Sequence, residues 1–289
     1  MQNEERGWQR SEGNLLHQKH YGGRGRQRAD IQSHMVHSTA VIHPKAEIGA
    51  DCEIGPYCVI GENVVMGARC RLHSHVVVDG HTRLGEGNEI FPFASIGLKT
   101  QDLKWRGGVT WTEIGDQNTF REYVTINSAT GDGEKTIVGS NNHILAYCHL
   151  AHNTTLGSRI IMSNVATLAG HVTVEDYAVI GGLVAIHQFC RIGRMSMIGG
   201  CSKVVQDVPP FMLADGNPAE TRTINKTGME RNGVSEEAQA ALRQAYKILF
   251  REGLTISNAL TRIDKGSANF PEVRHLAQFV RASERGISK

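Results

Sequence analysis

The 289-residue sequence has no apolar run long enough to span a membrane and no hydrophobic stretch typical of a secretion signal. We therefore expect a cytoplasmic protein without a membrane span. The formal net charge of +2 is too small to indicate nucleic-acid binding. Only six cysteines are present, and they mostly fall within a regular repeat, so we expect reduced thiols that act as small apolar fillers.

What the sequence does contain is a six-residue period of apolar residues. It runs without a miss from Ile42 to Ile96, returns over 114–126 and continues from Val138 to Val204. Neither a 3.6-residue nor a two-residue pattern produces this period, whereas hexapeptide periodicity is typical of a parallel β-helix. Each hexad is then one short strand and one corner, which predicts three flat faces, three hexads per coil and coils about 4.8 Å apart.

The ends of the period divide the chain into three segments. Residues 1–35 are polar and aperiodic, so we expect a disordered extension or an added leader. Residues 36–210 form the β-helix, which ends at Pro209 and Pro210 because consecutive prolines cannot donate to a parallel ladder. Residues 211–289 form a connector and a small C-terminal helical domain.

Within this last segment we expect an irregular or extended connector up to residue 232, followed by helices. Capping residues and apolar stripes predict helices over 236–251 and 255–264, and a third that begins at Pro271. The helices carry basic residues that either form a solvated face or dock an acidic partner. These are Arg243, Lys247, Arg251, Arg274 and Arg281.

Two interruptions break the period, at residues 97–113 and 127–136. The first contains Lys99, the run Gln101-Asp102-Leu103-Lys104 and Trp105. A loop thrown out of a solenoid costs little closure entropy and is a common place for substrate contacts, although Trp105 could simply pack the loop against a coil. The second interruption is polar and predicts another surface loop.

Histidines gather after the second interruption, at positions 149, 152, 171 and 187. His171 and Gln188 follow His152 at close to one and two coil lengths, so coils of three hexads would stack these side chains on successive turns. An imidazole is a natural general base for a hydroxyl near neutral pH, and an unshielded N–H at Gly170 could stabilise an oxyanion. A ladder of corner histidines bonded to one another and to water is the alternative; four such residues in register favour a functional site.

Several motifs in this order resemble the bacterial UDP-N-acetylglucosamine acyltransferases, which act at the first step of lipid A synthesis. They are the stretches 149–152, 167–171, 187–190 and 206–210 and the loop 101–104. The resemblance runs from about residue 36 to the C-terminus. It implies a left-handed parallel β-helix that forms a homotrimer with active sites between subunits, and it implies neither a metal nor an organic cofactor.

The implied reaction moves a 3-hydroxyacyl chain from acyl carrier protein to the 3-hydroxyl of UDP-N-acetylglucosamine. The resemblance implies that His152 is the general base, that the Gly170 amide holds the oxyanion, and that an acidic carrier protein docks on the basic helices. The other implied contacts are Gln101, Asp102 and Lys104 for the sugar or its phosphates, His149 and His171 for positioning, His187, Gln188, Asn225 and Arg231 for the nucleotide and its diphosphate, and Gly200 for the acyl-chain pocket.

The sequence departs from the family's pattern at three positions. Asn153 stands where an aspartate usually follows the catalytic histidine, a loop beginning at Asn127 replaces a histidine, and Thr227 replaces a glutamate. Because Asn153 can still accept a hydrogen bond, we expect a slower enzyme rather than an inactive one. Two alternatives stay open: an acyltransferase that acts on a 3-amino sugar nucleotide, and a non-catalytic hexapeptide-repeat binding trimer.

Two further alternatives on the same solenoid are disfavoured. An N-acyltransferase of the same pathway carries a sizeable uridine-binding domain before the helix, for which residues 1–35 are too short. A zinc-dependent carbonic anhydrase needs a longer spacing than the one between His149 and His152, and it would leave the loop 101–104 unexplained.

Overall fold

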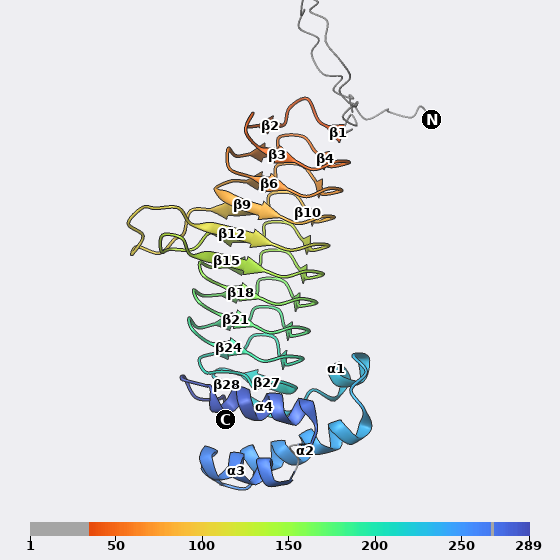
Figure 1. Ribbon diagram of the computed structural model, residues 1–289, viewed down its shortest axis with the longest axis vertical. Coiled ribbons are helices and arrows are strands. Elements are labelled where there is room, and N and C mark those ends of the chain that lie inside the picture. Colours follow the sequence, from red (N-terminus) through yellow and green to blue (C-terminus); the bar gives the residue numbers. More distant parts are fainter. Residues whose placement is uncertain (1–34, 267–268) are drawn as a thin grey trace, which may run out of the picture.

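The computed structural model describes residues 35–266 and 269–289, and its main body is a solenoid of short parallel strands (Figure 1). Three sheets run along the solenoid, one for each face predicted from the hexads. The extension predicted over residues 1–35 lies outside the described residues, apart from Met35 at the start of β1. A mainly β chain with a few C-terminal helices is confirmed.

The three sheets take their strands in turn along the chain. The first sheet has 11 strands in the spatial order β1 (Met35–Val36), β4 (Glu53–Ile54), β7 (Arg71–Leu72), β10 (Glu89–Ile90), β13 (Thr119–Phe120), β16 (His143–Ile144), β19 (Ile161–Met162), β22 (Val179–Ile180), β25 (Met197–Ile198), β27 (Met212–Gly216) and β28 (Ala219–Ile224). The second sheet has nine: β2 (Val41–Ile42), β5 (Val59–Ile60), β8 (Val77–Val78), β11 (Ser95–Leu98), β14 (Thr125–Asn127), β17 (His149–Leu150), β20 (Thr167–Leu168), β23 (Ala185–Ile186) and β26 (Lys203–Val204). The third has eight: β24 (Arg191–Ile192), β21 (Thr173–Val174), β18 (Thr155–Leu156), β15 (Lys135–Val138), β12 (Trp111–Ile114), β9 (His81–Leu84), β6 (Val65–Met66) and β3 (Glu47–Ile48).

Neighbouring coils are held in register by parallel pairing. Glu53 pairs with Arg71, three hexads later, which confirms the predicted coil length. The interval grows to five hexads between Ser95 and Thr125 and is four hexads between Thr125 and His149. The two interruptions account for these longer intervals, because the coil resumes in phase after each loop.

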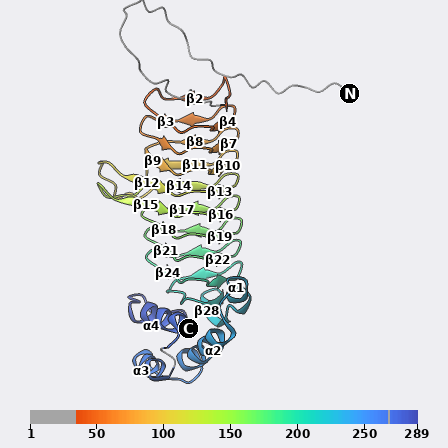
Figure 2. The same ribbon diagram turned by 45° about the vertical axis from the view of Figure 1, so that its right-hand side comes forward.

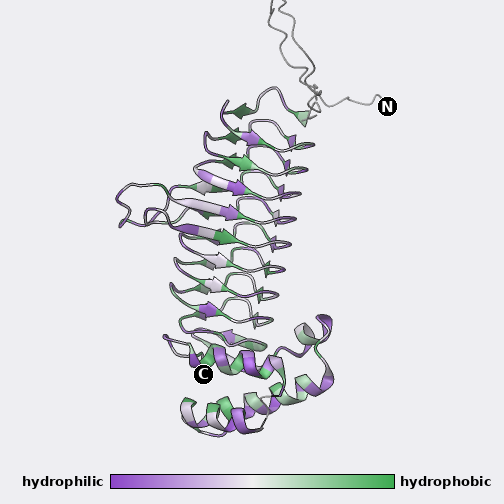
Figure 3. Cartoon of the chain, in the orientation of Figure 1, coloured by the Kyte–Doolittle hydropathy of each residue, from purple (hydrophilic) through white to green (hydrophobic). Residues whose placement is uncertain are grey.

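The solenoid is filled by the apolar residues of the period. Ile54, Leu72 and Ile90 are fully buried, and Figure 3 shows green hydrophobic segments recurring from coil to coil beside purple, hydrophilic ones. Five of the six cysteines are buried and unpaired, as predicted, whereas Cys201 is exposed. Inward-pointing short strands therefore build one continuous core along the solenoid axis.

Most corners between sheets are turned by residues with positive φ that are not glycine. Between the first and second sheets, φ is 63° at Tyr147, 67° at Val165 and 59° at Leu183. This backbone conformation is costly for such side chains. It is held by bonds between coils, such as the one that Val165 N–H donates to Ala146 O at 3.0 Å.

The stretch 211–232 is more regular than predicted. β27 pairs in parallel with β25 and in antiparallel with β28, so the first sheet continues beyond the two prolines. Helix α1 (Lys226–Arg231) follows. The prediction of an irregular or extended connector missed this hairpin and helix, because their residues pair with the otherwise open edge of the last coil, a contact that the local sequence does not reveal.

The three later helices lie where the sequence predicted them, at the end of the solenoid (Figures 1 and 2). They are α2 (Glu236–Phe250), α3 (Ile256–Gly266) and α4 (Pro271–Arg281). Ser235 caps α2 by accepting a hydrogen bond from Ala238 N–H at 3.2 Å. Leu242 and Leu276 are fully buried in a second apolar cluster that also contains Phe211, which joins the helices to the last coil. None of the helices within the described residues combines the length and apolarity needed to cross a bilayer.

Candidate active site

Both interruptions emerge at one corner, between the second and third sheets. The first leaves β11 and returns at β12, and the second leaves β14 and returns at β15. In Figure 1 they protrude together from one side of the solenoid. His152 lies at this same corner one coil further on, because it follows β17 and precedes β18.

The two loops brace each other through hydrogen bonds. Val109 N–H donates to Asp132 Oδ1 at 2.7 Å, and Gly133 N–H donates to Val109 O at 2.7 Å. At the base of the loops, Thr100 Oγ1 and Thr130 Oγ1 are 2.9 Å apart. These bonds give the polar loops a defined position beside His152.

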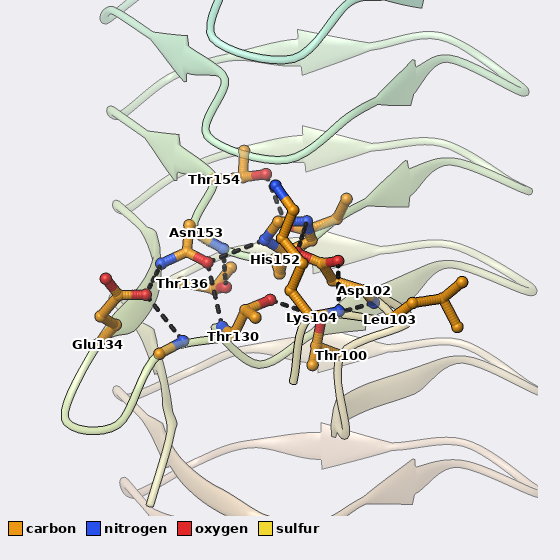
Figure 4. Close-up of polar contacts among 12 residues, drawn as sticks. Thr100, Asp102, Leu103, Lys104, Thr130, Glu134, Thr136, His152, Asn153 and Thr154 are labelled. Carbon is orange, nitrogen blue, oxygen red and sulfur yellow. Dashed lines mark hydrogen bonds and ion pairs between the residues drawn. The ribbon is translucent and has the colours of Figure 1, made fainter. Parts of the chain in front are cut away.

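The His152 ring is held between its neighbour and the first loop (Figure 4). Its Nδ1 lies 2.9 Å from Asn153 Oδ1, and its Nε2 lies 3.7 Å from Asp102 Oδ2. The His152 side chain keeps 15% of its surface exposed and that of Asp102 keeps 21%. Since an amide oxygen can only accept, Nδ1 carries the hydrogen and Nε2 presents its lone pair toward the loop.

Gly170 lies beneath the His152 ring. A Cβ added to Gly170 would overlap the ring atoms of His152, so only glycine leaves this ring in place. Within residues 35–266 and 269–289, the Gly170 N–H has no acceptor. The position therefore combines close packing against the His152 ring with an unused donor.

His149 and His171 flank His152 in different ways. His149 Nδ1 is 2.7 Å from Thr125 Oγ1 of the preceding coil. The His171 ring meets the His152 ring edge-on, with centroids 5.2 Å apart, and stacks on Phe189 at 4.7 Å. Burial, and secondly the positive charge that His152 gains whenever it takes up a proton, lowers the pKa of both His149 and His171, so neutral imidazoles surround the candidate base.

The four histidines do not form one ladder, contrary to the prediction. Strict register places Gly170 and Gln188 in line with His152, since β17, β20 and β23 pair at intervals of three hexads. His171 comes one residue after Gly170 and is therefore moved one place along the corner. His187 faces elsewhere, with its Nδ1 3.4 Å from Arg285 Nη2, and Gln188 is exposed.

In the first loop, hydrogen bonds hold Asp102 in place, whereas the side chains of Gln101 and Lys104 are exposed to a ligand. Asp102 N–H donates to Thr100 Oγ1 at 3.0 Å, and Asp102 Oδ1 accepts from Lys104 N–H at 2.9 Å. Gln101 and Lys104 are exposed beside it. Trp105 packs within the loop, where Lys99 Nζ lies 4.6 Å from its ring centroid.

Three predicted site residues lie away from His152 within one subunit. Asn225 is a buried helix cap whose Oδ1 accepts from Gly228 N–H at 3.0 Å and whose Nδ2 donates to Met195 O at 2.8 Å. Arg231 lines a pocket of about 440 Å³ beside His143 of the first sheet. Gly200 lies at the corner between the first and second sheets. A single subunit therefore does not gather all the predicted residues.

One pocket extends from the corner toward the C-terminal helices. A pocket of about 680 Å³ begins at His171 and Phe189 and reaches Arg285.

On the C-terminal helices, the basic surface is narrower than predicted. Arg251 donates to Tyr246 Oη, and Arg281 pairs with Asp264 at 2.8 Å. Two exposed cations, Arg243 and Lys247, have no ion pair within the described ranges.

Sequence reasoning missed the second-loop residues that contact Asn153. Asn153 Nδ2 donates to Glu134 Oε2 at 2.7 Å, and Asn153 Oδ1 accepts from Thr130 N–H at 3.1 Å. Thr136 Oγ1 accepts from Asn153 N–H at 2.9 Å. The available signal was the break in the period over residues 127–136, in which all three lie. Among the described residues, no three His, Cys, Asp or Glu side chains are grouped to hold a metal ion.

The chain is similar in sequence to known acyltransferases. The family described as "Udp N-acetylglucosamine O-acyltransferase; Domain 2" matches residues 207–288, and the "GMPPB C-terminal domain" matches residues 36–131. The acyl-[acyl-carrier-protein]--UDP-N-acetylglucosamine O-acyltransferase of Gloeothece citriformis is 44% identical over 208 residues, which cover 72% of this chain and 75% of the relative. The Synechocystis protein of the same name is 43% identical over the same shares.

Solved structures agree with these relatives. LpxA from Acinetobacter baumannii superposes with a TM-score of 0.85 at 45% identity, covering 88% of this chain and 99% of that one. LpxA from Bacteroides fragilis, a UDP-N-acetylglucosamine acyltransferase, gives 0.86 at 40% identity and covers 88% and 100%. These matches confirm that the β-helix is left-handed.

Proposed function

Because this chain belongs to the family of acyl-[acyl-carrier-protein]–UDP-N-acetylglucosamine O-acyltransferases, we propose that its acyl transfer takes place at the His152 corner. The chain is an enzyme of this class, which serves lipid A synthesis. The observation that carries the proposal is the His152 ring itself, with Nδ1 bound to Asn153 Oδ1 at 2.9 Å and Nε2 open toward the first loop.

In the proposed first step, His152 acts as the general base. Its Nε2 takes the proton of the sugar's 3-hydroxyl as that oxygen attacks the thioester carbon of the 3-hydroxyacyl carrier protein. The imidazolium that forms lies near the Asp102 carboxylate, whose charge stabilises it. The neutral His149 and His171 beside it position the substrate without adding positive charge.

In the second step, the tetrahedral intermediate collapses. Its oxyanion is held by the Gly170 N–H, which lies against the His152 ring and has no other acceptor within the described part of the chain. The carbon–sulfur bond breaks, the carrier thiol takes the proton from His152, and the new ester stays on the sugar. No metal or organic cofactor enters these steps.

We place the sugar and its phosphates against Gln101, Asp102 and Lys104 of the first loop. His187, Gln188, Asn225 and Arg231 serve the nucleotide side, and Gly200 bounds the acyl-chain pocket. Within one subunit, Gly200 and Arg231 lie on faces other than that of His152. This separation supports a homotrimer in which neighbouring subunits complete each site.

The acidic carrier protein is proposed to approach the C-terminal helices, where Arg243 and Lys247 are exposed. The pocket from His171 to Arg285 leads from this end of the molecule toward the reacting corner. The unpaired cysteines are consistent with the reducing cytoplasm that we propose as its location.

The test is acyl transfer from a panel of 3-hydroxyacyl carrier proteins to UDP-N-acetylglucosamine. His152→Ala is expected to lower kcat by about 1,000-fold, since a general base contributes roughly 10²–10⁴. His43→Ala, which removes a histidine from a distant coil, should leave the rate unchanged and serves as the matched control. The panel also measures the preferred chain length.

The same assay separates the alternatives. Transfer to a 3-amino sugar nucleotide but not to UDP-N-acetylglucosamine would replace the acceptor and keep the reaction class. No transfer to either acceptor would leave a binding trimer. Equal activity of His152→Ala and the wild type would contradict the proposed base.

A further inference from the structure

Asn153 poses a problem of orientation that an aspartate would not. A carboxylate presents an acceptor on both oxygens, whereas an amide presents an acceptor on one side and a donor on the other. Only with Oδ1 toward His152 does the ring keep its hydrogen on Nδ1 and a free lone pair on Nε2. A flipped Asn153 would donate to Nδ1, move the ring hydrogen to Nε2 and block the base.

The second loop supplies the groups that fix this orientation (Figure 4). Glu134 Oε2, which when ionised can only accept, lies 2.7 Å from Asn153 Nδ2. Thr130 N–H, which can only donate, lies 3.1 Å from Asn153 Oδ1. Both contacts favour the same position of the amide, and flipping it would place donor against donor and acceptor against acceptor.

Glu134 is itself held in place. Its Oε2 also accepts from Gly131 N–H at 2.9 Å, and its backbone carbonyl accepts from Trp111 N–H at 2.9 Å. A Cβ at residue 131 would overlap the Glu134 carboxylate, so the glycine makes room for it. The hydrogen bonds from Asn153 and Gly131 lower the pKa of Glu134, which therefore stays ionised around neutral pH.

We infer that Glu134 is a positioning residue that acts on His152 through Asn153. Together the amide and the carboxylate do what a single aspartate would do: they orient the ring and place a negative charge behind it. The inference rests on the proposed function of His152 and adds a loop residue to that site. The contact is exposed, so its effect should be smaller than that of the base itself.

A set of variants tests this inference by steady-state kinetics. Glu134→Ala is expected to lower kcat about tenfold with little change in KM, because it affects the ring and not substrate contacts. Glu134→Gln can keep an amide oxygen facing Asn153 Nδ2 and should lose no more than about threefold. Glu113→Ala, which removes a carboxylate paired with Lys135 on the neighbouring strand, is the matched charge control and should change kcat by less than twofold.

The decisive comparison is made in the Asn153→Asp background. There the new carboxylate orients His152 directly, and Glu134 becomes a like charge beside it, so Glu134→Ala should now leave kcat unchanged or raise it. A tenfold loss in both backgrounds would mean that Glu134 only supports the loop, and would overturn the inference. No loss in either background would overturn it as well.

A second measurement needs no turnover. The nitrogen NMR shifts of the His152 ring report which ring nitrogen carries the hydrogen. The wild type should hold it on Nδ1, and Glu134→Ala should shift part of the population to Nε2; an unchanged spectrum contradicts the inference. Activity that survives in His152→Ala would instead refute the proposed function, so the two failures are distinguishable.

Discussion

Two corners of the solenoid share one backbone geometry and differ in most of the contacts that their side chains make. Between the first and second sheets, aromatic rings stack from coil to coil, with Phe93 and Tyr123 at 5.0 Å and Tyr123 and Tyr147 at 4.8 Å. Between the second and third sheets, two loops and the pair His152 and Asn153 interrupt such a column, which is reduced to His171 stacked on Phe189 at 4.7 Å. The first corner is repetitive and mostly apolar; the second breaks the repeat and collects polar groups.

The difference indicates where chemistry can be built on a periodic fold. The coil that carries the site has a position with φ near 60° at both corners, taken by Tyr147 at one corner and by Asn153 at the other. A repeated side chain there makes a uniform surface suited to contact between subunits. Inserted loops instead bring residues such as Glu134 against a coil that lies further along the chain, where Asn153 meets it.

After the loss of His152 itself, Gly170→Ala should have the largest effect on activity at the polar corner. The added methyl group would displace the His152 ring, and a misplacement of about 1 Å can cost on the order of 100-fold in kcat. Steady-state kinetics and thermal unfolding should be measured together. Gly182→Ala at the apolar corner, where the nearest atom to the new Cβ is 3.3 Å away, is the comparison for the fold. An active Gly170→Ala enzyme would contradict the proposed placement of the ring.

Leu183→Asp should disrupt assembly through the apolar corner, and its effect on activity should be intermediate. Leu183 is 60% exposed beside Val165, and a charge there would oppose burial between subunits. We expect dissociation of the proposed trimer in analytical ultracentrifugation and about a tenfold loss of activity in dilute solution, because each site would lose its neighbouring residues. Leu103→Asp, on a loop residue that is 93% exposed, should leave the assembly unchanged. An intact trimer in Leu183→Asp would place the subunit contact elsewhere.

The sequence predicted the repetitive corner better than the polar one, for a physical reason. The hexad period dictated coil length, core residues and strand positions, since each depends only on residues one or three hexads apart. The site depends on single-residue offsets and on loops. His171 lies one residue beyond strict register with His152 and so leaves the line, and Glu134 meets Asn153 only because Val109 and Asp132 brace the loops. Such contacts between loops leave no periodic signal.

The smallest expected effect concerns pH and the two histidines that flank the base. Burial and the His152 charge lower the pKa of His149 and His171, although Glu134 and Asp102 partly oppose this at His171. Above a pH of about 6.5 these rings are neutral in both the folded and the unfolded chain, so their protonation does not lower the free energy of unfolding. As the pH falls below that value, the unfolded chain takes up protons that the folded chain resists, and stability declines until the folded pKa values are passed.

The melting temperature of the wild type should therefore fall more steeply between pH 7 and pH 5 than that of the His149→Gln/His171→Gln variant. The difference at pH 5 should be about 1–3 °C, because each partly buried histidine makes only a small contribution. The matching change at the apolar corner is Val165→Ala, which removes no titratable group and should leave the pH slope unaltered. Equal slopes for the wild type and the double variant would show that the neutral imidazoles around His152 carry no protonation cost. The polar corner would then differ from the apolar one in its loops alone.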